Sequence, residues 1–398
     1  MKRRLVILTE IISPYRIPLF NALAQRGEVD LHVIFLAETD LDLRQWQIPK
    51  EEIRFSYQIL PSWRRRIGRY NALLNRGVGR ALTKAAPDVI LCGGYNYIAS
   101  WQALFWARMH KIPFVLWSES NVQDLRRGHA LVEFLKAEFL TKCSGFVVPG
   151  KSALEYLRAH KVEEGAVFVA PNAVDNDFFA AAAAAARQEA AKWRGEFILP
   201  ERYFLFVGRM VREKGVFELL SAYAKLDASM RQQIGLVFVG DGALRPQLEL
   251  QAAAISPGVI TFAGFAQREK LAVYYALAET VILPTYTDTW GLVVNEAMAC
   301  GLPVIVSHVA GCVADLLRQD WNGLLVEPRD VSSLTSAMWT IADQPGLRAS
   351  MGANSMQHIS QYSSTEWSAG VIRMAQATGG TGDQQSDGGK GLRGGKHD

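Results

Sequence analysis

Short apolar runs alternate with longer amphipathic stretches along most of the chain. The runs are rich in Val, Ile, Leu and Phe and are bounded by Gly, Pro, Asp or Asn, which is typical of buried strands. In the first half, the predicted strands are residues 5–10, 31–36, 87–93, 113–119, 145–150 and 166–172, and the predicted helices are residues 16–26, 71–86, 97–110, 130–142 and 150–160. This alternation predicts a parallel sheet with right-handed crossovers.

A second series of the same kind begins after residue 200. Its predicted strands are residues 203–208, 234–240, 259–264, 280–284, 303–307 and 323–327. The alanine-rich segment that precedes it, residues 178–195, predicts a helix or a helical linker, because alanine is the best helix former.

The two series predict two α/β domains, at residues 1–172 and 173–376. Residues 345–376 carry a helical pattern, and in a two-lobed protein such a segment could cross back to the first domain. The remaining residues, 377–398, are glycine-rich and polar, so we expect a disordered tail.

Composition narrows the class of protein. The chain has 398 residues, of which 49% are hydrophobic and 21% charged, enough for two ordinary cores. No apolar stretch reaches the roughly 18 residues of a membrane helix, and the start MKRRLVILTE is interpreted as a strand. The cysteines are widely spaced and the histidines show no metal-binding spacing, so we expect a cytoplasmic protein with buried thiols and no metal.

The net charge of +4 is uneven. Residues 1–170 hold 24 Lys and Arg against 16 Asp and Glu, a net charge of +8, and the remainder is at −4. A basic first half favours an anionic acceptor or peripheral contact with the inner face of a membrane, but it is too mild for nucleic acid. Residues 62–85 cluster several arginines that could bind lipid headgroups, although a solvated surface explains them slightly better.

The densest cluster of chemically useful residues follows the fourth strand of the second series. A polar loop carries Asp288, and a helix is expected to begin near Gly291 and to carry Glu296 in its second turn. The first N–H groups of a helix lack partners within it, so those of Gly291, Leu292 and Val293 suit an anion such as a diphosphate. The carboxylates of Asp288 and Glu296 can reach one cleft and accept hydrogen bonds from sugar hydroxyls.

Two further strand-to-helix turns lie in the second half. In FVGRMVREKGVFELL, Arg209 and Lys214 follow a strand that ends at Gly208, and two fixed cations there suit a diphosphate leaving group. The alternative for Arg209 and Lys214 is a surface ion pair, for example with Glu213. In FVGDGALRPQLE, Gly240 allows a ligand to approach the backbone, and a purely structural turn explains it nearly as well.

Together these segments resemble the retaining glycosyltransferases of the GT-B fold, the large family often called group 4 or group 1-type. GRMVREKG, GDG, TFAGF and an E-x7-E element that here reads Asp288-x7-Glu296 occur in the family's order over about residues 200–330. PNAVD, residues 171–175, resembles the interdomain hinge of the family. The resemblance implies an α/β fold of two facing Rossmann-like domains with parallel sheets and an interdomain cleft.

The resemblance also implies roles for individual residues. Arg209 and Lys214 would hold the donor diphosphate, and Glu296 would accept hydrogen bonds from the ribose hydroxyls. Asp288 would touch the transferred sugar; the family usually has Glu there, so the side chain is one methylene shorter. The donor-binding positions implied beside these are Gly208, Gly240, Gly264, Phe265, Trp290, Gly291, Leu292 and Val293.

The implied reaction needs no protein nucleophile. The sugar passes from a nucleotide-diphosphate donor to an acceptor hydroxyl on the same face, through an oxocarbenium-like state, while the departing phosphate oxygen takes the proton. Positioning and charge stabilisation then do the catalysis, with Arg209, Lys214 and the helix start in place of a metal. By analogy with the family, the product would be a surface polysaccharide or a glycolipid.

The first domain lacks the usual glycine-rich first loop of the family. Because open α/β sheets bind ligands at the carboxyl ends of strands, we expect acceptor contacts there. The candidates are Ser13, Tyr15, Arg16, Tyr95 and Asn96. Many relatives carry a His near the position of Glu119, which we take as a catalytic candidate; a helix cap or a buried hydrogen bond explains Glu119 about as well.

Two alternatives stay open. A nucleotide-sugar epimerase of the same fold would need acid–base groups at the sugar and no acceptor. A non-catalytic nucleotide-sugar-binding regulatory protein is kept open by Asp288 and by the missing His of the first domain.

Overall fold

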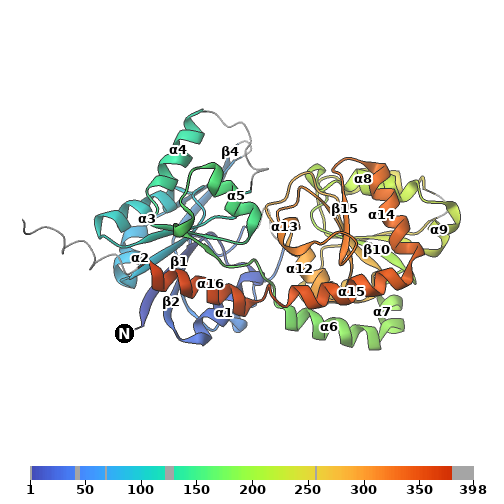
Figure 1. Ribbon diagram of the computed structural model, residues 1–398, viewed down its shortest axis with the longest axis horizontal. Helices are drawn as coiled ribbons and strands as arrows, with labels where there is room; N and C mark the ends of the chain where they lie inside the picture. Colours follow the sequence, from blue (N-terminus) through green and yellow to red (C-terminus); the bar gives the residue numbers. More distant parts are fainter. Residues whose placement is uncertain (1, 41–44, 68–69, 122–129, 256–257, 379–398) are drawn as a thin grey trace, which may run out of the picture.

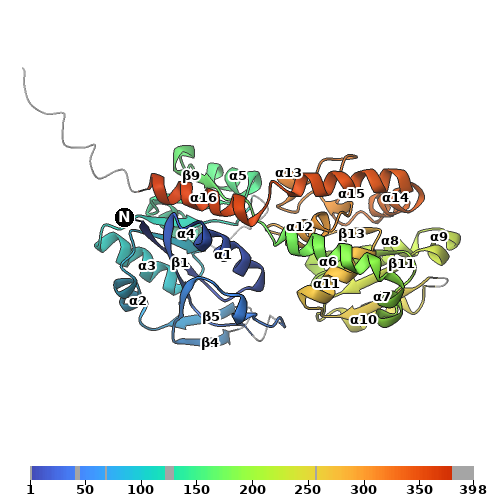
Figure 2. The same cartoon turned by 90° about the horizontal axis from the view of Figure 1, so that it is seen from below.

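The computed structural model describes residues 2–40, 45–67, 70–121, 130–255 and 258–378, which form two lobes side by side (Figures 1 and 2). Each lobe is built on one fully parallel sheet. The strands of the first sheet are β1 (Arg3–Thr9), β2 (Val29–Phe35), β3 (Ser56–Ile59), β6 (Val89–Gly93), β7 (Phe114–Trp117), β8 (Gly145–Val148) and β9 (Val167–Val169). Those of the second sheet are β10 (Tyr203–Val207), β11 (Gly235–Val239), β12 (Ile260–Gly264), β13 (Thr280–Leu283), β14 (Val304–Ser307) and β15 (Gly323–Val326).

Both sheets have the Rossmann strand order. The first runs β3-β2-β1-β6-β7-β8-β9 and the second runs β12-β11-β10-β13-β14-β15. In each, the order reverses beside the first strand, so a crevice opens at the carboxyl ends of β1 and β6 and of β10 and β13. The expected α/β fold of two facing Rossmann-like domains is therefore confirmed.

Helices cover both faces of each sheet, which is why the central strands are apolar on both sides. Leu5, Val6 and Ile7, consecutive on β1, have no exposed surface. The first lobe carries α1 (Ile17–Arg26), α2 (Val78–Ala85), α3 (Ile98–Met109), α4 (Ala130–Thr141), α5 (Lys151–Ala159) and the short helices η1 (Pro14–Arg16), η2 (Lys50–Glu52) and η4 (Glu164–Ala166). The second carries α6 (Asn176–Gln188), α7 (Ala190–Phe197), α8 (Val216–Ala224), α9 (Ala228–Gln233), α10 (Arg245–Ala252), α11 (Arg268–Leu277), α12 (Leu292–Ala299), α13 (Val313–Leu316), α14 (Val331–Asp343), α15 (Pro345–Ile359) and η5 (Arg212–Lys214).

The chain crosses between the lobes twice, and the two crossings lie together. Val174, before α6, pairs with Ser363, which caps the last helix, α16 (Ser364–Ala377). Asn176 donates hydrogen bonds to the carbonyls of Ile359 and Tyr362 at 3.1 Å each. Helix α16 then packs on α1 of the first lobe (Figures 1 and 2).

The helix predicted at residues 71–86 is wrong in its first half. Strand β5 (Tyr70–Asn75) pairs there with β4 (Ser62–Ile67) in an antiparallel hairpin, and α2 begins only after Gly77, whose φ is +82°. Leu73 is buried and Leu74 is 41% exposed, the alternation of a strand. Residues 70–75 form a strand and not a helix because pairing with β4 stabilises them more than their weak local preference for a helix does.

The prediction that every strand is buried is also wrong for strands at the edges of the sheets. Strands β9 and β12 each have one neighbour, and Val169 is 45% exposed.

The alanine-rich segment is part of the second-lobe core, since Phe179, Ala183 and Ala186 on α6 are buried. Cys143 is half-buried, whereas the other cysteines are buried as expected. The predicted tail lies outside the described residues from 379 onward.

Within the described ranges, no helix combines the length and apolar character that crossing a lipid bilayer requires.

Candidate functional site

A cavity of about 280 Å³ lies between the lobes, at the carboxyl ends of both sheets. First-lobe residues that follow β1 and β7 meet second-lobe residues that follow β10 and β13. The lining residues are Tyr15, Arg16, Leu19, Trp117, Glu119, Asn172, Ala173, Val207, Gly208, Arg209, Lys214, Leu283, Asp288, Thr289, Trp290, Gly291, Leu292 and Val293. Eleven candidate residues from the sequence are among them, drawn from both halves of the chain.

Close backbone packing places the Lys214 turn. Gly215 has φ of +66°, and a Cβ there would stand 2.0 Å from the carbonyl oxygen of Pro284. The turn is also bonded to the loop after β13, because the carbonyl of Glu213 accepts from the Tyr286 N–H and the Thr285 hydroxyl, both at 2.8 Å. Only glycine allows the two loops to approach this closely.

This packing pairs Lys214 with Asp288. Lys214 Nζ donates to Asp288 Oδ2 at 2.5 Å, and both side chains are largely buried. Lys214 therefore pairs with the predicted sugar contact and not with Glu213. Arg209 lies at the mouth of the same cavity, is exposed, and makes no ion pair with the part of the chain that the structure describes. Its guanidinium is available to a diphosphate.

The start of α12 faces the cavity. Gly291 adopts φ of +98°, and the backbone then enters the helix at Leu292. Trp290 is buried, and its indole N–H donates to Asn295 Oδ1 at 2.8 Å. Asn295 in turn donates from Nδ2 to the carbonyl of Asn172, in the crossing between the lobes, at 2.9 Å. The α12 start is thus held to the hinge through one buried amide.

Glu296 lies one turn along α12, behind the cavity. Its Oε2 accepts from the hydroxyl of Tyr275 at 2.6 Å, and Tyr275 has no exposed surface. Burial raises the pKa of Glu296 to about 7, although the Tyr275 hydrogen bond opposes the shift. Burying a carboxyl group costs free energy when it is ionised, and groups with such shifted pKa values are common at binding sites. A contact between Glu296 and a ribose stays a prediction.

The opposite wall of the cavity is organised around Arg16. Its guanidinium contacts Thr9 Oγ1 at 3.0 Å and Glu119 Oε2 at 3.2 Å, and lies 4.3 Å from the ring centroid of Trp117. Burial disfavours the charge, but Glu119, with smaller effects from Tyr15 and Glu10, raises the pKa of Arg16 overall. Arg16 and Glu119 therefore face the donor-side residues as a fixed ion pair.

Several candidates do not line the cavity. Tyr95 points into the first-lobe core, where its hydroxyl lies 3.2 Å from that of Tyr156, and Asn96 is exposed elsewhere. Ser13 is buried and is not among the lining residues. In the loop that follows a strand, only some side chains point into the crevice. The side chains of Ser13, Tyr95 and Asn96 are not among the lining residues.

Two of the predicted glycines also serve packing instead of lining the cavity. A Cβ on Gly240 would stand 2.0 Å from the carbonyl oxygen of Gly208, so the structural interpretation of that turn fits. Gly264 accepts from the Gly240 N–H at 2.7 Å, and Phe265, 42% exposed, follows it beyond the cavity. A contact of Phe265 with a base stays a prediction.

From the segment 117–121, whose sequence places it after a strand at the crevice, the sequence singled out only Glu119; the candidate residues did not include Trp117, Asn121, Asn172 or Asn295. A usable signal existed for the first two, because Trp117, Glu119 and Asn121 are spaced by two and an extended chain puts such residues on one side. No comparable pattern marks Asn172 or Asn295, which are joined by tertiary contact.

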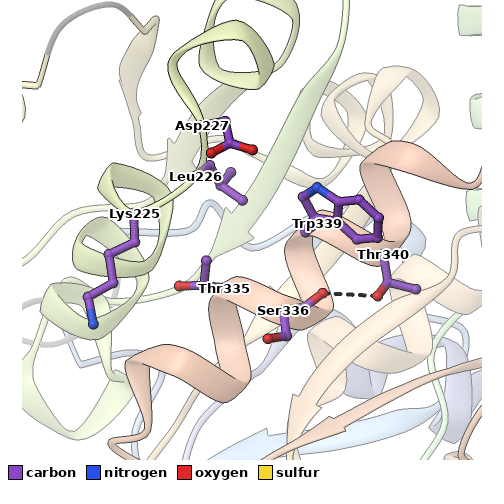
Figure 3. A pocket seen from close by; sticks show the side chains of 7 residues that line it. All are labelled: Lys225, Leu226, Asp227, Thr335, Ser336, Trp339 and Thr340. Carbon is purple, nitrogen blue, oxygen red and sulfur yellow. Dashed lines mark hydrogen bonds between the residues drawn. The ribbon is translucent and has the colours of Figure 1, made fainter.

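Among the described residues, no group of three or more His, Cys, Asp or Glu side chains could hold a metal ion. A second cavity of about 250 Å³ opens on the outer face of the second lobe, with Trp339 and Thr340 of α14 on one side (Figure 3). It contains none of the predicted site residues.

Comparison with known proteins matches both lobes. A family model described as glycosyl transferases group 1 matches residues 188–358, and one described as glycosyltransferase family 4 matches residues 19–178. A D-inositol 3-phosphate glycosyltransferase of Corynebacterium jeikeium is 33% identical over 207 residues, 50% of this chain and 48% of that protein. An uncharacterised glycosyltransferase of Methanocaldococcus jannaschii is 31% identical over 170 residues, 42% of each chain. The matched part spans about half the length of these relatives.

Solved structures resemble almost the full length of the chain. Anabaena HepE in complex with UDP has a TM-score of 0.73 at 16% identity, covering 95% of this chain and 100% of that one. Sucrose-phosphate synthase from Thermosynechococcus elongatus has a TM-score of 0.69 at 22% identity, covering 94% and 98%. At these identities the likeness shows the two-lobed GT-B fold.

Proposed function

The chain belongs to the group 1 glycosyltransferases of the GT-B fold, and from that premise we propose that it transfers a sugar from a nucleotide diphosphate to an acceptor hydroxyl with retention of configuration. The observation that carries the proposal is one cavity in which Arg209, Lys214 and the start of α12 converge from separate segments. Two cations and a helix N-terminus at a topological switch point are the chemistry that binds a diphosphate.

The proposed reaction uses these groups for charge. As the bond from the sugar to the diphosphate breaks, negative charge grows on the leaving phosphate, and Arg209, Lys214 and the α12 backbone stabilise it. The leaving oxygen takes the proton of the acceptor hydroxyl, which attacks from the same face. In this scheme Asp288, which is bonded to Lys214, contacts the sugar beside the diphosphate. On this scheme the fixed cations do the electrostatic work that a metal ion does elsewhere.

The acceptor is proposed to bind against the first-lobe wall. Arg16 is held by Thr9, Glu119 and Trp117, so it offers a fixed cation beside the reacting sugar. A polyhydroxylated acceptor with an anionic group fits this wall. A surface polysaccharide or glycolipid precursor meets that description, and so does an inositol phosphate, the acceptor in the name of several relatives.

Peripheral membrane contact is proposed for the first lobe. Its net charge of +8 over residues 1–170 accompanies apolar side chains that stand in solvent on neighbouring helices. Phe105 and Met109 on α3 are each 67% exposed, and Phe134 on α4 is 60% exposed. Cosedimentation with phosphatidylglycerol vesicles, and not with phosphatidylcholine vesicles, is the expected result; Phe105→Asp should weaken it.

Thermal unfolding with nucleotides tests the donor site. Wild type, Lys214→Ala and Arg209→Ala are heated with UDP, GDP, ADP or CMP at millimolar concentration, beginning with UDP because HepE was solved with it. A ligand at about 100 times its Kd stabilises the native state by about 2.7 kcal/mol. One nucleotide should raise the wild-type midpoint and have little effect on either variant. No shift with any of the four would refute the donor site and favour a non-catalytic relative.

A further inference from the structure

Asp288 is held by both lobes at once. Its backbone carbonyl accepts from the N–H of Gly311, in its own lobe, at 3.0 Å. The same carbonyl accepts from Asn121 Nδ2, in the first lobe, at 2.9 Å. The residue proposed to contact the transferred sugar therefore depends on a side chain across the cleft.

Asn121 belongs to the segment that follows β7, which ends at Trp117. Trp117, Glu119 and Asn121 are spaced by two along this segment, the spacing that puts side chains on one side of an extended chain. The first two line the cavity, and Asn121 reaches past it to the Asp288 loop. Asn121 has no exposed surface, so its amide cannot exchange this acceptor for water without moving the lobes.

The junction leaves little room for adjustment. A Cβ on Gly311 would stand 2.0 Å from the carbonyl oxygen of Thr289 and 3.1 Å from Asn121 Nδ2. On its other side, Asp288 Oδ1 lies 3.3 Å from the N–H of Trp290, and Oδ2 is bonded to Lys214. A displaced carbonyl would therefore displace the carboxylate as well, because the two belong to one short, packed turn.

We propose that Asn121 is a positioning residue that sets the Asp288 carboxylate against the transferred sugar when the lobes are docked. The proposal rests on the proposed function of the cavity. Opening the lobes would break the Asn121 bond and leave the Gly311 bond intact. Nucleotide binding, which uses Arg209, Lys214 and α12 of the second lobe, would then be independent of Asn121, whereas sugar transfer would depend on it.

Asn121→Asp is the sharpest variant, since it keeps the shape of the side chain and sets a carboxylate against the Asp288 carbonyl. Asn121→Ala removes the donor without adding charge. Asn354→Ala is the matched control, because Asn354 Nδ2 also donates to a backbone carbonyl, that of Trp321, at 2.8 Å, and neither residue lines the cavity. All variants are compared in the full chain.

Three readouts separate positioning from a general structural role. Calorimetric titration with UDP should give affinities within about twofold of wild type. Release of UDP from UDP-glucose should show kcat about ten- to a hundredfold lower with KM little changed, because small misplacements of a reacting group cost this much. Amide hydrogen exchange over residues 285–311 should be faster in both Asn121 variants than in wild type and Asn354→Ala.

Wild-type kcat and wild-type exchange in Asn121→Asp would overturn the proposal. So would a joint loss of kcat, UDP affinity and unfolding midpoint, since that is the behaviour of a purely structural residue. If wild type binds no nucleotide, the proposed function fails; the exchange comparison needs no ligand and still decides whether Asn121 holds the Asp288 loop.

Discussion

Glu296 should make the protein less stable as the pH rises, and replacing it with glutamine should abolish this contribution to the pH dependence. In the unfolded chain its carboxyl has an ordinary pKa of 4.5, whereas in the folded second lobe burial raises the pKa to about 7. Between these values the native state holds a proton that the unfolded state has lost, so the free energy of unfolding falls with rising pH. Above the folded pKa the cost is complete, at about 3 kcal/mol, because each pKa unit is worth about 1.4 kcal/mol.

Glu296→Gln removes the titration and keeps the size of the side chain. Urea unfolding of both proteins is followed by tryptophan fluorescence at about pH 5 and about pH 8.5, where the wild-type carboxyl is mainly protonated and mainly ionised. The variant should gain about 2–3 kcal/mol more over wild type at the higher pH. The matched control is Glu163→Gln, which makes the same chemical change at an exposed acid of the first lobe.

Two results would refute the reasoning. An advantage of Glu296→Gln that is equal at both pH values would mean that the carboxyl is not desolvated in the native state. Tyr275→Phe provides the second check, because the hydroxyl of Tyr275 donates to Glu296 and opposes the rise in its pKa. Its removal should move the pH-dependent loss of stability to higher pH, and a shift to lower pH would contradict the assignment.

Three further substitutions test the packing around the cavity and the returning helix. Gly215→Ala forces a Cβ against the carbonyl of Pro284 at a φ of +66°, so it should lower stability by about 2 kcal/mol and weaken UDP binding; an unchanged unfolding midpoint would count against it. Trp367→Ala empties a site with no exposed surface in the first-lobe core and should cost about 3–5 kcal/mol in urea unfolding; a loss below about 1 kcal/mol would contradict the assigned packing. Asp288→Glu restores the residue usual in the family, and its longer side chain must displace Lys214, which now lies 2.5 Å away. UDP affinity should be unchanged, while the ratio of kcat/KM for UDP-glucose to that for UDP-galactose should change. An unchanged ratio would argue against a sugar contact.

Much of the fold could be predicted because the central strands are apolar on both faces. A run such as 203–207 is buried along its whole length, so it identifies a parallel strand without knowledge of its neighbours. The hairpin of β4 and β5 could not be predicted in this way. Leu73 and Leu74 fit a helix as well as a strand, and only pairing with an arginine-rich partner decides between them.

The donor side of the candidate site was also accessible from the sequence, because its parts are local. Arg209 and Lys214 follow one strand, and Asp288 and the start of α12 follow another. The residue types within each turn therefore indicate anion binding or sugar binding without knowledge of the other turn. Their convergence needs only the rule that ligands bind at a topological switch point. The first-lobe wall was harder to predict from the sequence. Tyr95 and Arg16 both follow strands, but only Arg16 lines the cavity.

The sequence by itself determined most of the strand and helix series of both lobes, apart from β3, β4 and β5 of the first lobe, and the residue types that suit a diphosphate, because these depend on neighbours along the chain. The tertiary structure alone decided that Lys214 pairs with Asp288, that Tyr275 orients Glu296, and that Asn121 reaches Asp288 across the cleft. Such contacts join residues far apart in the chain, and their energies depend on the distance and burial that packing creates.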